Sequence, residues 1–285
     1  MTIHRKLSDS WRNIRAIAKK DLLEVRQNRA AWMPMVIAPA LIILVLPLAL
    51  LLSLQYDMVA VEKMVDDPDL RLMIERMPAS MLGLLQGLDE LQGMLVLVLG
   101  YMFAPLFLIF PLAFSSVVAA ESFAGERERK TMEALLYTPA TERELFLGKV
   151  LAGLIPSLGI SWLSFLGYAL VLNTAGYPIF GYIWFPVASW WPLIFWITPA
   201  LALLGISATV LISARVQTFM GAYQTSSSLV VIVLAFLVGQ LSGVVYLTVG
   251  VGLLVGLLFW AIAVALMLLA LCGFRRSSLL LDMKT

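Results

Sequence analysis

The sequence predicts an all-α membrane protein with six transmembrane helices. Of its 285 residues, 61% are hydrophobic and only 13% are charged, whereas about 25% of the residues in a soluble domain are charged. The apolar residues also form long charge-free runs, and a helix of about 20 such residues crosses the hydrocarbon core of a bilayer. A transmembrane barrel would instead alternate apolar and polar residues over short segments, and the sequence lacks that pattern.

Six apolar runs are long enough to cross a membrane. They cover residues 31–54, 94–118, 150–172, 187–212, 223–239 and 247–272. Pro34, Pro39 and Pro47 predict kinks in the first run. The fifth and sixth runs could form one re-entrant unit, but two full spans are favoured because their combined length far exceeds one crossing. We expect residues 1–285 to form a single transmembrane domain.

The basic residues predict how the chain is oriented. With six spans, seventeen Lys and Arg residues fall on one side of the membrane, and only Lys63, Arg71 and Arg76 fall on the other. Cytoplasmic loops are enriched in Lys and Arg. Both termini and the central segment 119–149 are therefore expected in the cytoplasm.

Residues 1–30 combine a cytoplasmic tail with a predicted amphipathic helix. Trp11, Ile14, Ala18, Leu22 and Val25 recur at steps of three and four residues, and basic residues occupy other positions on the helical wheel. This spacing predicts a helix that lies in the membrane interface. Anchoring to anionic lipid and contact with a cytoplasmic partner are both compatible with it.

The outer loop, residues 55–93, is acidic and carries apolar residues at helical spacing, such as Leu70, Ile74 and Met77. We expect one or two short helices on the outer membrane surface. They would form either a packed cap over the spans or a gate for a substrate or receptor.

Several kinds of functional site are excluded or disfavoured by the sequence. The predicted spans contain no Asp, Glu, Lys or Arg, which argues against a self-sufficient ion-coupled carrier. With His4 and Cys272 as the only His and Cys, no multi-ligand zinc site of these residues can form. Gly148-Lys149 is followed by Val150, so it fails the P-loop pattern. We expect no catalytic, metal or cofactor site in this chain, and any uphill transport needs energy from another subunit.

The spans do contain uncharged polar residues. Hydrogen bonding between helices is the default explanation for them, and a substrate path is the alternative. The candidates for such a path are Thr198, Ser207, Gln224 and Ser227.

The central segment predicts two cytoplasmic helices. A short one is expected around Arg127 to Tyr137, with an i,i+4 pair between Arg129 and Glu133. Its small apolar face consists of Met132, Leu135 and Leu136, and such a face fits a groove in a partner protein.

The first of these helices should stop at Thr138-Pro139, because proline disfavours a helical residue before it. Thr141 and Glu144 then have the spacing of a capping box. The helix that begins there should continue through Gly148-Lys149 into the third span.

The run GERERKTMEALLYTPATERELFLGKVLAG, residues 125–153, resembles the signature of ABC type-2 exporter permeases, notably the sodium-efflux and drug-efflux permease group. That signature is E-x-E-x-x-T-x-E-x-L-L-x-x-P, followed by G-K at the entry to the third span. The matching residues are Glu126, Glu128, Thr131, Glu133, Leu135, Leu136, Pro139, Gly148 and Lys149.

The resemblance implies that this segment, including Arg129 and Met132, is a coupling helix that docks on an ATPase subunit. It further implies a dimer of permeases with two ABC ATPase subunits, which hold ATP and magnesium, in a prokaryotic plasma (inner) membrane. A homodimer is expected, and a heterodimer is the alternative. No nucleic-acid partner is expected. The outer loop is shorter than the folded outer domain of some members, which leaves the substrate subgroup open.

The expected function is therefore the permease subunit of an ATP-driven exporter. The alternatives are an ion-gradient-driven secondary carrier and an intramembrane lipid-modifying enzyme, for which a Ser-Lys pair involving Lys149 is conceivable. Because the spans lack fixed charge, a lipid-like or amphiphilic cargo fits somewhat better than a bare ion.

Overall fold

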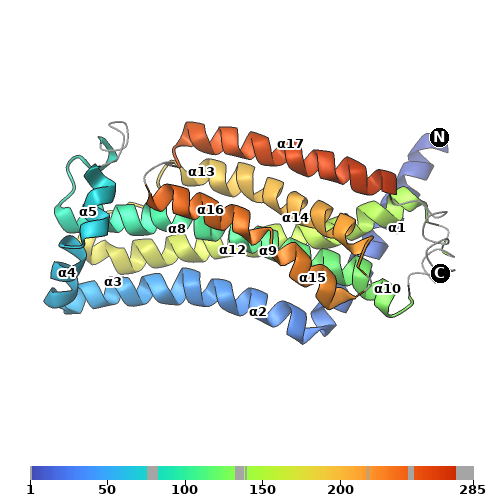
Figure 1. The fold of residues 1–285 in the computed structure, drawn as a ribbon, viewed down its shortest axis with the longest axis horizontal. Helices are drawn as coiled ribbons and strands as arrows, with labels where there is room; N and C mark the ends of the chain where they lie inside the picture. Colours follow the sequence, from blue (N-terminus) through green and yellow to red (C-terminus); the bar gives the residue numbers. More distant parts are fainter. Residues whose placement is uncertain are drawn as a thin grey trace.

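A computed structural model describes residues 2–75, 83–131, 138, 140–216, 218–242 and 247–273. Within these ranges the chain forms helices joined by turns, and no strand occurs among them. The long helices run side by side along the longest axis of the molecule (Figure 1). Two short helices, α4 Met58–Val65 and α5 Pro68–Glu75, lie at one end of this bundle, and the short helix α10 Glu126–Glu128 lies at the other.

Among the residues that the structure describes, six helices are long and apolar enough to cross a membrane. They cover Met35–Tyr56, Glu90–Glu128, Glu142–Phe180, Trp190–Ser213, Phe219–Gln240 and Val249–Cys272. Each overlaps one predicted span, so the prediction of an all-α protein with six spanning helices is confirmed. The second and third of these helices extend well beyond the predicted runs 94–118 and 150–172 on both sides.

Four of the spans combine several helical segments. The first span consists of α2 Arg29–Pro39, η1 Ala40–Val45 and α3 Leu46–Tyr56, and the second consists of α7 Glu90–Leu95, η3 Val96–Met102, α8 Phe103–Phe107, α9 Ile109–Ala120, η4 Glu121–Gly125 and α10. The third span is α12 Glu142–Phe180, and the fourth consists of α13 Trp190–Pro192, η5 Leu193–Ile197 and α14 Thr198–Ser213. The fifth span consists of α15 Phe219–Ser227 and α16 Val230–Leu241, and the sixth is α17 Val249–Gly273. Each η segment named here is a π-helical turn. Pro39 and Pro47 flank η1, where proline cannot donate the usual helical hydrogen bond.

The second and fourth spans form the centre of the bundle. Their most apolar stretches are 72% and 78% buried, whereas those of the other four spans are between 17% and 33% buried. Segment α9 packs against α14 and α12, and α14 also packs against α17. The peripheral helices therefore present long apolar surfaces outward, as expected of helices that face lipid.

Side chains from three helices fix the π-helical segment η3 in the bundle core. The hydroxyl of Tyr168 donates to the carbonyl of residue 99 at 2.7 Å, the indole of Trp190 donates to that of residue 100 at 2.7 Å, and the amide of Gln240 donates to that of residue 101 at 2.7 Å. A π-helical turn changes the backbone hydrogen-bond pattern, and buried carbonyls need partners. Gln240 thus confirms helix-to-helix hydrogen bonding for one polar residue of the spans.

The outer loop folds as short helices, as predicted. Asp57 caps α4 by accepting from the backbone N–H of Val59 at 2.9 Å, and α4 packs on α7. Met64 of α4 and Ile74 of α5 pack against the main core. This packing fits a cap over the spans. Residues 76–82 of the loop, including Met77, lie outside the described residues.

The N-terminal helix α1, Thr2–Gln27, is present, but its apolar face differs in part from the prediction. Ile14, Ala18 and Val25 are buried, and the helix packs along α12. Trp11, by contrast, is 64% exposed. Much of the apolar face thus covers the protein's own helices, a third possibility beside the predicted lipid anchor and partner contact.

Gly205 allows α14 to approach α9 closely. A Cβ atom at this position would lie 2.4 Å from Ser115 Oγ and 2.8 Å from the carbonyl oxygen of Leu112. Neither neighbour can move away easily, since Ser115 is buried and the second atom is backbone.

We therefore predict that Gly205→Ala destabilises the protein by about 1–3 kcal/mol through overpacking. A thermal melt of the purified protein in detergent should show a lower midpoint. Gly159→Ala is the control, because a Cβ there meets nothing within 4 Å and alanine favours a helix interior. Equal melting midpoints for the two variants would contradict the close contact.

Candidate functional site

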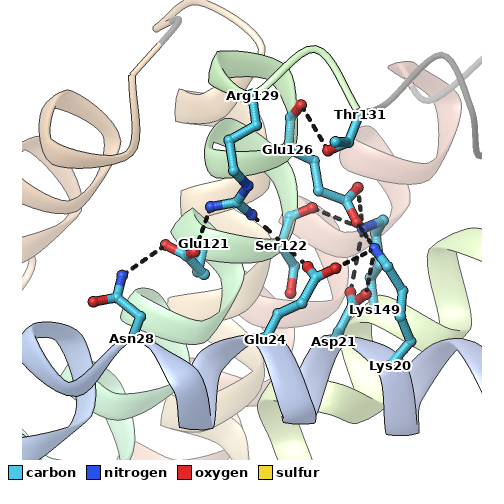
Figure 2. A network of polar contacts seen from close by, with 10 residues as sticks. All are labelled: Lys20, Asp21, Glu24, Asn28, Glu121, Ser122, Glu126, Arg129, Thr131 and Lys149. Carbon is cyan, nitrogen blue, oxygen red and sulfur yellow. Dashed lines mark hydrogen bonds and ion pairs between the residues drawn. The ribbon is translucent and has the colours of Figure 1, made fainter.

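A network of charged side chains joins three separate parts of the chain at the α10 end of the bundle (Figure 2). Its members come from α1, from the end of the second span, and from the beginning of α12. They are Lys20, Asp21, Glu24, Glu121, Glu126, Arg129 and Lys149.

Lys149 is the most deeply buried cation of this network, with a side chain that is only 1% exposed. Its Nζ lies 3.2 Å from Asp21 Oδ2 and 2.6 Å from Glu126 Oε2, and it donates to the carbonyl of Ser122 at 2.7 Å. Both carboxylates are also fully buried. Removing charges from water is costly unless they are paired, so each of these groups depends on the others.

Lys20 joins the same two carboxylates from the more exposed side. Its Nζ contacts Glu126 and lies 3.1 Å from Glu24 Oε1 and 3.5 Å from Asp21 Oδ1. Burial alone would lower the pKa of Lys20, but the neighbouring carboxylates, Glu126 foremost, outweigh it and raise that pKa. The Lys20 ammonium is therefore a fixed positive charge of the network.

A second pair of carboxylates is held next to the first. Arg129 donates from Nη1 to Glu121 Oε1 at 2.7 Å and lies 3.7 Å from Glu24. Burial lowers the pKa of Arg129, but Glu121 and Glu24 raise it overall. The amide of Asn28, which follows α1, donates to Glu121 at 3.4 Å. Glu24 thus lies between the two halves of the network.

The π-helical segment η4 explains how Glu121 and Glu126 both face α1. In an α-helix, residues five positions apart point about 140° away from each other. The wider turn of a π-helix brings such residues nearer to one face. Glu121 accordingly meets Asn28 and Glu126 meets Lys20, both from the α1 side.

The second span ends in a Schellman motif directly after Glu126. The N–H of Thr131 donates to the carbonyl of Glu126 at 2.9 Å, and that of Lys130 donates to Arg127 at 3.0 Å. Lys130 has φ 57°, the left-handed conformation that this motif requires. The Thr131 hydroxyl adds a bond to the same Glu126 carbonyl at 3.2 Å.

This helix end is also fastened to the fourth and fifth spans. Arg127 donates from Nη1 to the carbonyls of Ser213 at 2.9 Å and Ala214 at 3.3 Å, which lie at the end of α14. Glu128 accepts from the backbone N–H of Phe219 at 2.8 Å, at the start of α15. The chain that enters the predicted coupling segment is thereby held by four other parts of the fold.

The predicted short helix around Arg127 to Tyr137 needs correction where the structure describes it. Residues 127 and 128 end the preceding helix, and the chain leaves helical geometry at Lys130. Arg129 pairs with Glu121, and its predicted partner Glu133 lies outside the described residues. The fold therefore satisfies the charged groups by tertiary contacts that a local i,i+4 pattern does not reveal. The remaining predicted coupling residues, Met132, Glu133, Leu135, Leu136 and Pro139, lie outside the described residues.

The predicted capping box is present at the start of α12, where the central segment ends. Thr141 Oγ1 accepts from the N–H of Glu144 at 3.3 Å, and Glu144 Oε2 accepts from the N–H of Thr141 at 2.9 Å. Asn13 of α1 also donates to this carboxylate at 3.3 Å. Farther along α12, a Cβ at Gly148 would lie 2.7 Å from Ile17, so glycine is needed for α1 to lie this close.

The candidate path residues do not form one site. Thr198 and Ser207 are buried on α14, but they lie nine positions apart and thus on opposite sides of a helix. Each donates to a carbonyl of its own span, of Leu193 and Leu203 respectively. Gln224 is exposed on α15, and Ser227 donates to the carbonyl of Tyr223. Which side chains line a substrate path stays a prediction.

Three acidic side chains have the spacing of metal ligands. Ligand oxygens of Asp21, Glu24 and Glu126 lie within 4.8 Å of one another. The ammonium groups of Lys20 and Lys149 already lie among them, so the network supplies its own positive charge. We assign it no metal.

Sequence reasoning missed this buried network. It placed Lys149 at the entry to the third span and Glu126 in a cytoplasmic coupling segment. Two signals were available, namely that Glu121 and Glu126 directly follow the second apolar run and that Lys149 directly precedes the third. Asp21, on the predicted amphipathic helix, is the complementary acid, but only tertiary packing brings it to Lys149.

The comparisons with known proteins agree with the architecture. The family model described as ABC-2 family transporter protein matches residues 15–258. This match includes the second half of α1, the network, the first five spans and the first part of the sixth. No curated protein matches the chain.

We predict that Lys149→Met lowers the free energy of unfolding by about 3–5 kcal/mol, because it removes the buried cation from two buried carboxylates and leaves them only the more exposed Lys20. Thermal unfolding in detergent would measure the loss. The triple variant Lys149→Met, Asp21→Asn, Glu126→Gln should recover much of it, and Lys63→Met, at an exposed position, is the control. A single variant as stable as the wild type would show that the buried pairs are not needed.

Proposed function

The chain belongs to the ABC-2 transporter family, and on that premise we propose that it is the permease subunit of an ATP-driven exporter that is powered by a separate ATPase subunit. It is a multi-pass membrane protein with the helices to form a transport path. The family implies an ABC ATPase as its partner. ATP and magnesium would bind to that partner, and the energy would reach this chain by contact.

The observation that carries the proposal is how the segment between the second and third spans is anchored. A Schellman motif ends at Thr131 on one side, and a capping box begins at Thr141 on the other. Both anchors touch α1, through Glu126 and Glu144. A partner that pushes on residues 131–141 would therefore push on α1 and on two spans at once, which is the property that coupling requires.

We place this end of the bundle in the cytoplasm. The even number of spans brings α1 and the end of α17 to the same end as α10 (Figure 1), and the excess of Lys and Arg there supports a cytoplasmic position. We further propose a homodimer of permeases with two ATPase subunits in a prokaryotic inner membrane. The cargo stays open.

The two alternative functions have less support. A secondary carrier would use ionisable residues at membrane depth, whereas the buried charges here gather at one end of the bundle and pair with one another. For a Ser-Lys enzyme, Lys149 would have to meet a hydroxyl, but among its described contacts are two carboxylates and the backbone carbonyl of Ser122. The Ser122 hydroxyl is buried without a described hydrogen-bond partner.

One prediction of the proposed function concerns binding of the ATPase subunit. A pull-down from native membranes should recover an ATPase subunit with the wild type and lose it with the double variant Leu135→Asp, Leu136→Asp, because charged side chains cannot enter an apolar groove. Arg71→Asp on the outer loop, at the opposite end, should retain the ATPase.

The absence of any ATPase from wild-type pull-downs in several mild detergents would refute this coupling scheme. So would ATP hydrolysis by the purified chain without a second subunit. Size-exclusion profiles and melting midpoints of the variants must match the wild type, so that lost binding is separated from lost folding.

Another prediction of the proposed function concerns the transmission of ATP-driven movement from the α10 end to the outer end. The double variant Glu24→Gln, Asn28→Ala removes the contact of Glu24 with Arg129 and that of Asn28 with Glu121. Asp21 and Glu126 keep Lys149 and Lys20, and Glu121 keeps Arg129. We expect the ATPase to co-purify still, but the response of the outer end to ATP and magnesium to shrink, by about 0.5–2 kcal/mol of coupling energy. The readout is the thiol labelling rate of Val59→Cys, a position that is 56% exposed on α4, in a Cys272→Ser background.

The control for transmission is Arg71→Gln, which removes an exposed ion pair with Asp66 at the outer end and should leave the response to ATP intact. An unchanged labelling response in the α1 double variant would show that the network does not carry the coupling.

A further inference from the structure

An apolar groove lies on the flank of α1 that faces away from the charge network. Its volume is about 470 Å³, within the range of small-molecule sites. The walls come from α1, α2, α9 and α12. The apolar lining includes Leu22, Val36, Phe114, Val118, Pro156 and Ile160.

The groove opens to the apolar outside of the bundle. Leu23 and Val36 at its walls are 46% and 41% exposed, and both belong to helices at the start of the spanning region. Trp32 also lines it and donates from its indole to the carbonyl of Arg26 at 2.9 Å. Tryptophan with one apolar and one polar side is typical of the membrane interface, so the groove lies where acyl chains meet headgroups.

Two cations complete the site. Lys19 and Arg26 line the groove, are exposed, and lie seven residues apart, two turns along the same side of α1. None of the ion pairs described for this chain involves either of them, although Lys20 and Arg129 nearby are fully engaged. An apolar slot with free cations at its rim has the chemistry to hold a ligand with a hydrocarbon chain and a phosphate.

We propose that this groove binds an anionic phospholipid of the cytoplasmic leaflet, with an acyl chain against Phe114, Val118 and Ile160 and the phosphate at Lys19 and Arg26. The lipid is a bound component that supports α1, not the cargo. The site does not depend on the ATPase partner, because all of its walls belong to this chain.

The position of the groove gives the lipid a structural effect. Lys20 and Asp21, on one flank of α1, hold the helix through the ion pairs. Leu22 and Arg26 lie on its other flank, in the groove. A seated lipid would thus support α1 from the side that the ion pairs leave free. Diffuse attraction of a basic helix to a charged surface would not need the apolar lining.

The test is native mass spectrometry of the purified full-length chain in detergent. Palmitoyl-oleoyl phosphatidylglycerol and phosphatidylcholine with the same chains are titrated separately, and free glycerol phosphate serves as a competitor. We expect the wild type to bind phosphatidylglycerol about tenfold more tightly than phosphatidylcholine, since each basic residue adds on the order of a few-fold to tenfold.

Three variants separate charge from shape. Lys19→Gln with Arg26→Gln should weaken phosphatidylglycerol binding about tenfold. Arg143→Gln with Arg215→Gln removes the same charge from exposed positions at the same end of the bundle and should change it less than about twofold. Ile160→Trp fills the groove and should weaken binding of both lipids, while Lys19→Arg with Arg26→Lys should bind as the wild type does.

Three results would overturn the proposal. Equal affinity of the wild type for the two lipids would remove the headgroup site. Equal losses in the two charge-neutralising variants, or full binding in Ile160→Trp, would reduce the interaction to surface attraction. Displacement of the lipid by glycerol phosphate would make the site one for a free phosphate. If a variant melts at a lower temperature than the wild type, the preference of the wild type for phosphatidylglycerol and the competition experiment still decide.

Discussion

The burial of Lys149 between Asp21 and Glu126 is the interaction on which the α10 end of the molecule depends. An ammonium that is 1% exposed can be tolerated only with compensating charges in contact, and these come from two distant segments. α1 is thereby fixed to the second and third spans by charge as well as by apolar packing. The remaining groups of the network then follow: Lys20 neutralises the excess of carboxylates, and Arg129 neutralises Glu121.

The opposite half of the bundle is held together by different chemistry. There, three carbonyls of η3 receive neutral hydrogen bonds from Tyr168, Trp190 and Gln240, and aromatic rings stack around them, with Tyr168 and Trp190 5.3 Å apart. Neutral bonds suit a region inside the hydrocarbon, where fixed charge is expensive. The chain thus places its buried ion pairs at the α10 end and this aromatic cluster within the bilayer.

The fold class followed from the sequence because span length is a one-dimensional property that the bilayer imposes. The capping box at Thr141 and Glu144 was also visible, since it is local. The charge network was not visible in the sequence, because Asp21 and Lys149 are separated by 128 positions. Each of these residues, taken alone, has the sequence context of a solvated charge. The end of the second span was misjudged for the same reason: Arg127 and Glu128 satisfy backbone groups of other spans, which no local pattern records.

The π-helical segment η4 shows why burial could not be inferred from spacing. Glu121 and Glu126 occupy different faces of a regular α-helix, so an α-helical wheel separates two residues that the fold directs to the same neighbour. The same limit applies to the candidate path residues. Polar side chains in apolar spans are conspicuous in sequence, but Thr198 bonds within its own span, whereas Ser207 bonds both to its own span and to Met267 of the sixth. Only the packing of neighbouring helices tells which face each one occupies.

The helix α12 has a mechanical consequence. It continues without interruption for 39 residues, through Pro156, from its cap at Thr141 to Phe180, a length of about 58 Å. Lys149 is held near one end, and Asn173, whose side chain accepts from the backbone of Trp184 and Phe185 at 3.1 Å, is held near the other. A continuous helix of this length acts as a lever. A tilt of about 5° about Lys149 would displace Phe180 by about 4 Å, so that a small rearrangement among ion pairs would become a large one beneath the outer cap.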